Sequence, residues 1–351
     1  MDKFFAIMER FAPEAVEIMV SRYQILKHVL YNQPIGRRQL TKNMSSTERL
    51  VRSELDLLKS RGAIQSTAAG IYLTDYGYEM LRDIETMVPD LFHIKVLAEK
   101  LKTRFGLREV LIVPGDSNHD HYTKEDLGRA AADFLHSSLY PGCIVAVTGG
   151  STLAGMASAM RAGLEQTEDI CLVPARGGLG ENVETQAGNI AAKIAQTIGA
   201  QYRLLHIPDN LEQSTAEALK KDIHVTEVLG IIKSARILVH GIGPAEEMTE
   251  RRGLSAKEKM FLQKNGAQGE ALRYYFDRMG KIIFEIPGIG LELEDINHID
   301  TIIAVAGGSN KAEAIEAVLH SDFDHILITD EGAAQKIIYG KDDSNGGKSC
   351  Y

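Results

Sequence analysis

The feature that most constrains the fold of this chain is a series of short apolar runs, each five or six residues long. Segments of helical periodicity separate the runs. The runs occupy residues 109–113, 143–148, 170–175, 203–207, 237–241, 281–286, 301–306 and 325–329. Continuous Val, Ile and Leu are typical of strands that are buried on both faces, as in parallel sheets covered by helices. The sequence therefore predicts an α/β fold with a doubly wound, mostly parallel sheet.

The start of the chain follows a different pattern. Helical spacing predicts helices over about 13–31, about 36–43 and from Ser45 onward. Ser45 and Glu48 have the spacing of a capping box. Two short runs flanking a small-residue turn then predict a hairpin over 63–66 and 71–74. This order resembles a winged helix-turn-helix. In the third helix the predicted buried positions are Leu50, Val51, Leu55, Leu57 and Leu58.

Charge supports a nucleic-acid role for this front module only. The whole chain has a net charge of -9, whereas residues 34–62 hold seven basic and three acidic side chains. Arg, Ser and Thr on a helix in the major groove can hydrogen-bond to base edges. The predicted DNA-binding residues are Arg37, Arg38, Ser46, Thr47, Arg49, Arg52 and Ser53. The alternative is a protein-interaction module whose charged face is solvated.

A connector joins the two parts. Its apolar positions from Met80 to Phe105 step by four and three residues, which is a heptad pattern. Pro89 divides it into helices over about 75–88 and 90–105. The seam either pairs two subunits or packs on each helix's own domain. We therefore expect a winged module over 1–75, a connector over 76–106, a ligand domain over 107–340 and a disordered tail over 341–351.

Glycine-rich loops follow several of the predicted strands. Residues 145–155 and 303–313 are near copies, each reading strand, Gly-Gly-Ser, helix, and LVHGIGPAEE lies between them. Glycines let the backbone approach a ligand, and a helix N-terminus offers free N–H groups and partial positive charge. Arg176, Arg251 and Lys311 fall at the same predicted sheet edge. This pattern predicts an anionic ligand, and several cationic groups favour more than one phosphate.

The sequence argues against a nucleotide cofactor, a metal and a membrane. The pattern G-x-x-x-x-G-K-[ST] is absent, and G-x-G-x-x-G fails at Gly241 and at Gly288. Three scattered cysteines suit neither disulfides nor zinc, and His119 and His121 lack zinc-type spacing. Without a signal peptide or an apolar run long enough to span a bilayer, we expect a cytoplasmic protein.

The loops TGGSTLAGM, ARGGLG, GIGP and AGGSNKAEAI together resemble the ligand domain of the SorC family of bacterial transcriptional regulators. The resemblance extends over nearly the whole chain. It implies a repressor of glycolytic genes that works as a homodimer or homotetramer. It also implies that a sugar bisphosphate, fructose-1,6-bisphosphate, relieves its binding to operator DNA.

The same resemblance implies roles for individual residues. Gly149, Gly150, Ser151 and Thr152 would bind one phosphate, with Lys311 beside them. The other phosphate would contact Arg176, Gly177, Gly178 and Arg251. Gln186 and Glu270 would contact sugar hydroxyls, and we place Glu270 on a helix. These residues and their numbers are those of the present chain.

The family's ligand domain is itself similar to sugar-phosphate isomerases and glucosamine-6-phosphate deaminase. A signature of those deaminases is G-I-G-x-D-G-H, and here residues 241–247 lack both the Asp and the His. A proton shuttle needs a titratable group within reach of the reacting carbon. We therefore expect no catalytic residues, with Glu246 as the one candidate substitute. The alternatives are an enzyme with an appended helical module and a phosphosugar-binding module whose front domain binds protein.

Overall fold

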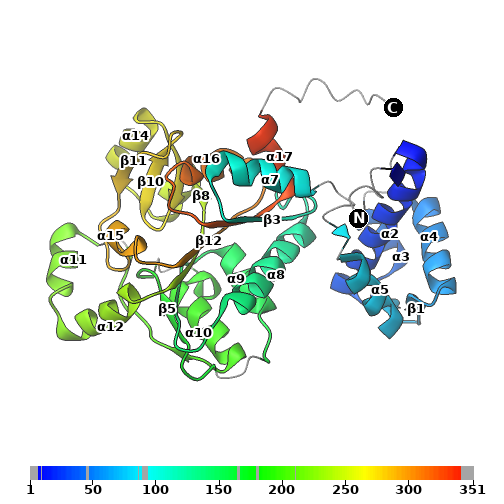
Figure 1. Ribbon diagram of the computed structural model, residues 1–351, viewed down its shortest axis with the longest axis horizontal. Helices are drawn as coiled ribbons and strands as arrows, with labels where there is room; N and C mark the ends of the chain where they lie inside the picture. The colour runs from blue at the N-terminus through cyan, green and yellow to red at the C-terminus, as the bar shows by residue number, and fades with distance from the viewer. Residues whose placement is uncertain are drawn as a thin grey trace. The chain divides into compact units, whose positions relative to one another are not determined.

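The computed structural model divides the chain into two compact units, Met1–Val96 and Leu97–Tyr351 (Figure 1). The residues that it describes are 7–8, 10–44, 47–85, 87–88, 94–163, 167–178, 182–209 and 211–340. The predicted tail, Pro89, Ser45 and Ser46 lie outside them. Among the described residues, no helix combines the length and apolar character needed to cross a membrane.

The first unit contains the predicted helices and hairpin. Its elements are α2 (Pro13–Asn32), α3 (Arg37–Asn43), α4 (Glu48–Ser60), β1 (Ile64–Ser66), β2 (Ile71–Leu73) and α5 (Asp75–Glu85). The strands β1 and β2 pair antiparallel. Beside them, Gly77 of α5 lies so close to Ala63 that an added Cβ would be 2.0 Å from the Ala63 carbonyl oxygen. This contact packs α5 directly against the hairpin, so that α5 forms a fourth helix of the first unit.

Two expectations for α4 are wrong. The N-cap is Thr47, whose hydroxyl accepts a hydrogen bond from the backbone N–H of Leu50, and not Ser45. Leu50 is 51% exposed, and Leu57 is only half-buried. The helix therefore buries a narrower stripe than predicted, formed by Val51, Leu55 and Leu58. Leu50 instead lies on the outward face.

The second unit is built on a seven-stranded sheet in the order β3-β13-β12-β7-β4-β5-β6, and every pairing is parallel. The strands are β3 (Glu109–Val113), β4 (Ile144–Val147), β5 (Cys171–Pro174), β6 (Gln201–Tyr202), β7 (Ile237–Gly241), β12 (Thr301–Val305) and β13 (Ile326–Asp330). The predicted parallel α/β class is confirmed. The strand expected over 203–207 is wrong, because the backbone pairs two residues earlier, at Gln201 and Tyr202.

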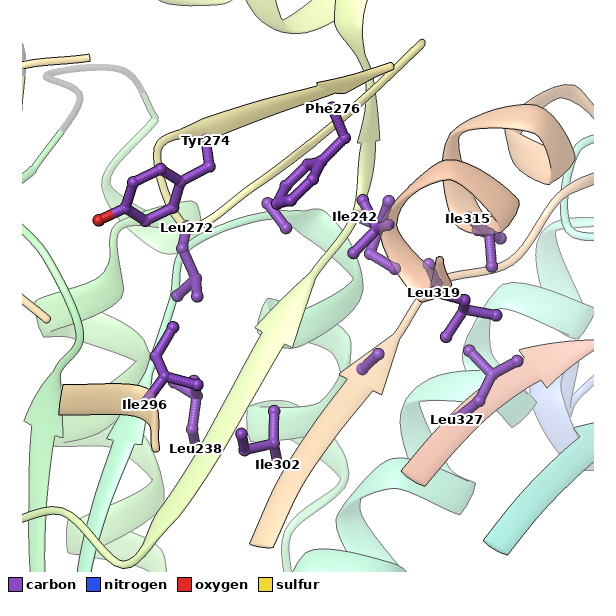
Figure 2. Packing of buried hydrophobic residues seen from close by; sticks show 14 of the residues in the cluster. Leu238, Ile242, Leu272, Tyr274, Phe276, Ile296, Ile302, Ile315, Leu319 and Leu327 are labelled. Atoms are coloured by element: carbon purple, nitrogen blue, oxygen red, sulfur yellow. The ribbon is translucent and has the colours of Figure 1, made fainter. Parts of the chain in front are cut away.

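Alternate strand residues point to opposite faces of the sheet, and each face has its own core. On one face Val145, Val147 and Val239 pack with α8 (His121–Ser138), α9 (Ser151–Ala159) and α10 (Ala187–Ile198). On the other, Ala146 and Leu238 belong to a core to which several helices contribute, as Figure 2 shows in part. These helices include α7 (Ile94–Phe105), α12 (Ile223–Lys233), α16 (Ala312–Leu319) and α17 (Glu331–Tyr339).

The connector seam is buried only in part. Leu101 and Phe105 of α7 are buried in the core of the second unit, whereas Met80 and Ile84 of α5 are only half-buried. The α7 part of the seam therefore packs on its own unit, and the pairing of two subunits through the α5 part stays a prediction.

A second, antiparallel sheet is an addition that the apolar runs did not predict. Its order is β11-β10-β9-β8. The strands are β8 (Gly243–Pro244), β9 (Ala267–Ala271), β10 (Tyr274–Asp277) and β11 (Ile282–Glu285). Residues 281–286 therefore form a strand outside the parallel sheet. Tyr274 and Phe276 pack on the main core (Figure 2). Tyr275 points to a smaller cluster with Met248 and Leu262 of α13 (Ala245–Arg251) and α14 (Ala256–Lys264).

The short elements that complete the second unit lie in its connections. They are η1 (Val183–Thr185), α11 (Gln213–Leu219), α15 (Leu293–Ile296) and η2 (Ser309–Lys311).

The close approach of α8 and α9 gives a test of this packing. A Cβ added at Gly128 would lie 2.9 Å from the carbonyl carbon of Gly155. We expect Gly128→Ala to lower the free energy of unfolding by about 1–3 kcal/mol, because the helices must separate. The measurement is urea unfolding followed by circular dichroism.

Gly230 in α12 is the matched control, since an added Cβ there meets nothing within 4 Å. Gly230→Ala is expected to raise the free energy of unfolding by up to about 1 kcal/mol, as in an exposed helix interior. Equal stability of the two variants would contradict the proposed contact.

Candidate anion-binding pocket and nucleic-acid interface

A pocket opens at the carboxyl ends of four neighbouring strands, β12, β7, β4 and β5. From β4 the chain continues outward to β5 and β6 and then returns to β7 on the other side of β4. In such sheets ligands bind where the direction of the connections reverses. Thr148 joins the two strands there, because its hydroxyl accepts a hydrogen bond from Gly241 N–H at 3.2 Å.

The loop after β4 requires its two glycines. A Cβ on Gly149 would lie 2.6 Å from the Thr185 carbonyl oxygen, and Gly150 has a φ of 126° that disfavours other residues. Gly150 is the N-cap of α9, and no side chain among the described residues caps this end. The N-terminus of α9 therefore presents backbone donors and partial positive charge to the pocket, where Gly150, Ser151 and Thr152 line the wall.

The second Gly-Gly-Ser loop is not equivalent to the first. The N–H of Ser309 already donates to Asp116 Oδ1 at 2.9 Å. Burial would raise the pKa of Asp116, but hydrogen bonds from Ser309 and Asn118 and the nearby His119 lower it overall. The Asp116 carboxylate thus accepts from the N–H group that we expected to bind a second anion. This loop contributes Lys311 to the pocket.

All the predicted ligand residues except Gly178 line this one pocket. They are Gly149, Gly150, Ser151, Thr152, Arg176, Gly177, Gln186, Arg251, Glu270 and Lys311. Gly178 lies in an adjacent hollow, which Arg176, Gln186 and Arg251 also line. Residues from six separate segments of the sequence therefore converge at one place.

Lys311 and Arg176 are cations that burial removes from most of the solvent. Burial lowers the pKa of Lys311; Glu247 opposes this effect, while Lys124 and Arg251 add to it. Burial also lowers the pKa of Arg176, although Asp209 opposes it. An anionic ligand would offset the cost of keeping these charges away from water.

A buried charge quartet supports the pocket from beneath its polar wall. Asp209 Oδ2 accepts from Arg176 Nη1 at 2.5 Å and also from Arg252 Nη1. Arg252 Nη2 donates to Glu270 Oε1 at 2.5 Å. Burial would lower the pKa of Arg252, but Glu270 and Asp209 raise it overall, so the guanidinium stays charged. All four side chains are buried.

The placement of Glu270 on a helix is wrong. It lies in the middle of β9, where it pairs with Tyr275 of β10 and with Gly243 of β8. A strand places alternate side chains on one face, so Glu270 faces the pocket and Arg252. Sequence reasoning also missed Asp209, because no motif surrounds it.

The carboxylate that lines the pocket from the GIGP segment is Glu247, and not Glu246. Glu246 is exposed and is not among the lining residues, whereas Glu247 is. The candidate substitute for the missing acid or base therefore does not line the pocket.

In the first unit, the outward face of α4 carries the predicted polar residues. Thr47, Arg49, Arg52 and Ser53 are all exposed. Arg52 Nε lies 3.9 Å from Asp56, a contact between exposed groups that costs little to break. On α3, Arg37 and Arg38 are exposed, and Arg37 lies 3.4 Å from Glu48. Ser46 is outside the described residues.

Two protein families match the chain. The family described as "CggR N-terminal DNA binding domain" matches residues 18–88. The family described as "Putative sugar-binding domain" matches residues 90–339. The central glycolytic genes regulator of Priestia megaterium is 39% identical over 339 residues, covering 96% of this chain and 99% of the relative. The protein of the same name from Bacillus subtilis is 38% identical over 338 residues, with the same coverage.

Solved structures agree with these matches. A SorC-family transcriptional regulator from Enterococcus faecalis, 36% identical, aligns with a TM-score of 0.64 over 69% of this chain and 99% of that chain. The full-length sorbitol operon regulator SorC from Klebsiella pneumoniae is 17% identical and has a TM-score of 0.66 over 92% and 98%, which bears on the fold alone.

Together the fold and these matches define a DNA-binding protein with a sugar-binding domain. The chain belongs to the SorC family of transcriptional regulators. The resemblance inferred from the loop sequences is thereby confirmed.

Adjacent arginines allow the quartet to be tested. We expect Arg252→Met to lower the free energy of unfolding by about 3–5 kcal/mol, because it leaves the buried Asp209 and Glu270 carboxylates without their partner. Arg251→Met, one position earlier at the pocket wall, is expected to cost much less. Thermal and urea unfolding of both variants provide the measurement, and similar losses would show that the quartet has no special structural role.

Proposed function

We propose that this protein represses glycolytic genes and that fructose-1,6-bisphosphate relieves its binding to operator DNA. The observation that carries the proposal is the distribution of charge in the pocket. Lys311 accompanies the uncapped N-terminus of α9, while Arg176 and Gly177 follow β5. Cationic groups contributed by different loops suit a ligand with more than one phosphate.

Other polar groups in the pocket suit a sugar. Gln186 and Glu270 line the same pocket, and amide and carboxylate oxygens accept hydrogen bonds from hydroxyls. The names of the two curated relatives support a role in glycolytic gene control. We assign one phosphate to residues 149–152 and Lys311, and the other to Arg176, Gly177 and Arg251. Gly178 would support this second region from the adjacent hollow.

The proposed DNA-binding residues are Arg37, Arg38, Ser46, Thr47, Arg49, Arg52 and Ser53. Arg49, Arg52 and Ser53 would meet base edges or phosphates in the major groove. A homodimer or homotetramer would place two such modules on a symmetric operator. We place the protein in the cytoplasm, which contains the operator DNA. The ligand changes DNA affinity only if it binds one arrangement of the assembly more tightly than another.

The test is a pair of DNA titrations. The DNA is a duplex selected by this protein from a random-sequence library, and its affinity is measured with and without saturating fructose-1,6-bisphosphate. We expect weaker DNA binding with the ligand. Unchanged affinity would contradict the proposed regulation. Failure to bind any DNA at low salt, where phosphate contacts are strongest, would contradict the DNA-binding role.

Two substitutions separate the two sites. Arg52→Ala is expected to weaken DNA binding roughly tenfold, because it removes a contact to a base or phosphate, and to leave ligand affinity unchanged. Thr152→Val is expected to weaken ligand binding roughly tenfold and to leave ligand-free DNA binding unchanged. Fluorescence anisotropy and calorimetry measure the two affinities. Loss of both DNA binding and ligand binding in each folded variant would contradict the assignment of these two activities to separate sites.

A further inference from the structure

A lysine that belongs to no sequence motif contacts the N-terminus of α9, at the end of the loop that follows β4. The ammonium of Lys124, in the first turn of α8, donates a hydrogen bond to Ser151 Oγ at 3.0 Å. Ser151 is the first residue of α9 and lines the pocket. Lys124 stands 27 positions earlier in the chain. Only the packing of α8 on α9 brings the two residues together.

That packing is close and leaves little freedom. An added Cβ at Gly128 would lie 2.9 Å from Gly155, so the two backbones are in contact. Lys124 is four residues before Gly128, and Ser151 is four residues before Gly155. Residues four apart lie on the same face of a helix. Each member of the Lys124–Ser151 pair is therefore one turn from the glycine contact, which aligns the first turn of α8 with the N-terminus of α9.

The start of α8 is itself held in place. Asp120 accepts hydrogen bonds from Tyr122 N–H at 3.0 Å and from the Thr123 hydroxyl at 3.0 Å. Asp120 is the N-cap of the helix. The backbone from which Lys124 extends is thus fixed at its cap and at its glycine contact, while the lysine side chain itself is only half-buried.

We propose that Lys124 is a further ligand-binding residue, which donates directly to the phosphate held at the N-terminus of α9. This inference rests on the proposed function and extends it. The phosphate would replace the neutral Ser151 hydroxyl as the acceptor, and Lys311 would contact the same group. Two ammonium groups and a helix N-terminus together match the charge of a doubly ionised phosphate monoester.

A second lysine that donates to a serine of α9 provides a matched control. Lys193 of α10 donates to Ser158 Oγ at 2.7 Å, two turns further along α9. The pair has the same chemistry as Lys124 and Ser151, but Ser151 lines the pocket and Ser158 does not. Lys193→Met removes an equal charge and an equal contact to α9 at a position distant from the phosphate loop.

The experiment compares wild-type protein with Lys124→Met, Lys124→Arg and Lys193→Met by calorimetric titration of fructose-1,6-bisphosphate at low and at high salt. We expect Lys124→Met to weaken binding about tenfold at low salt, as for loss of a charge-assisted hydrogen bond. The loss should shrink at high salt, because ions screen the exposed charge. Lys124→Arg should recover most of the affinity, and Lys193→Met should bind like the wild type.

Wild-type affinity in Lys124→Met would overturn the inference and leave the proposed function intact. So would an equal loss at both salt concentrations, since that is the result of a purely structural change. If the wild type itself does not bind the sugar bisphosphate, the proposed function fails. The same variants are then titrated with inorganic phosphate, and weaker binding by Lys124→Met alone would sustain the phosphate contact. Failure there as well would overturn it.

Discussion

The parallel pairing of β4 with β7 is the constraint on which the rest of the second unit depends. It buries Val145, Val147 and Val239 against one layer of helices and Ala146 and Leu238 against the other. Because both faces are covered, the strand ends are left as the place where backbone groups meet solvent. The connections reverse between these two strands, and the loops on each side separate enough to form a pocket.

The charge quartet then joins this edge to the antiparallel sheet. Arg176 follows β5, Asp209 precedes α11, Arg252 ends α13 and Glu270 lies on β9. Buried ion pairs contribute little net stability, but breaking one is costly. Such a group specifies how its segments meet, and here it positions one of the pocket's arginines. Arg176 and Arg252 share the same Asp209 oxygen. An anion that binds Arg176 can therefore change the position of Arg252, and through it the positions of α13 and β9.

Much of this arrangement could be predicted from the sequence, and what could not has identifiable causes. Short apolar runs predicted most of the parallel strands, and nearly every ligand residue expected from the loop patterns and the family resemblance lines the pocket. The antiparallel sheet was missed because its strands are short and carry polar residues such as Glu270. Leu50 was expected in the core because hydrophobicity alone cannot locate a helix face, and Thr47 starts the helix later than Ser45 would.

Asp209 and Lys124 depend on tertiary contacts, which local patterns do not encode. The individual ligand and DNA contacts stay predictions.

We propose that the pocket binds a sugar bisphosphate at both phosphates without transforming it. A phosphorus NMR spectrum of the protein mixed near stoichiometry with fructose-1,6-bisphosphate tests this directly. We expect both phosphate resonances to broaden or shift and no new species to form over hours. New product resonances would show that the pocket is an active site, and two unperturbed resonances would exclude this ligand; either result would overturn the proposed binding mode.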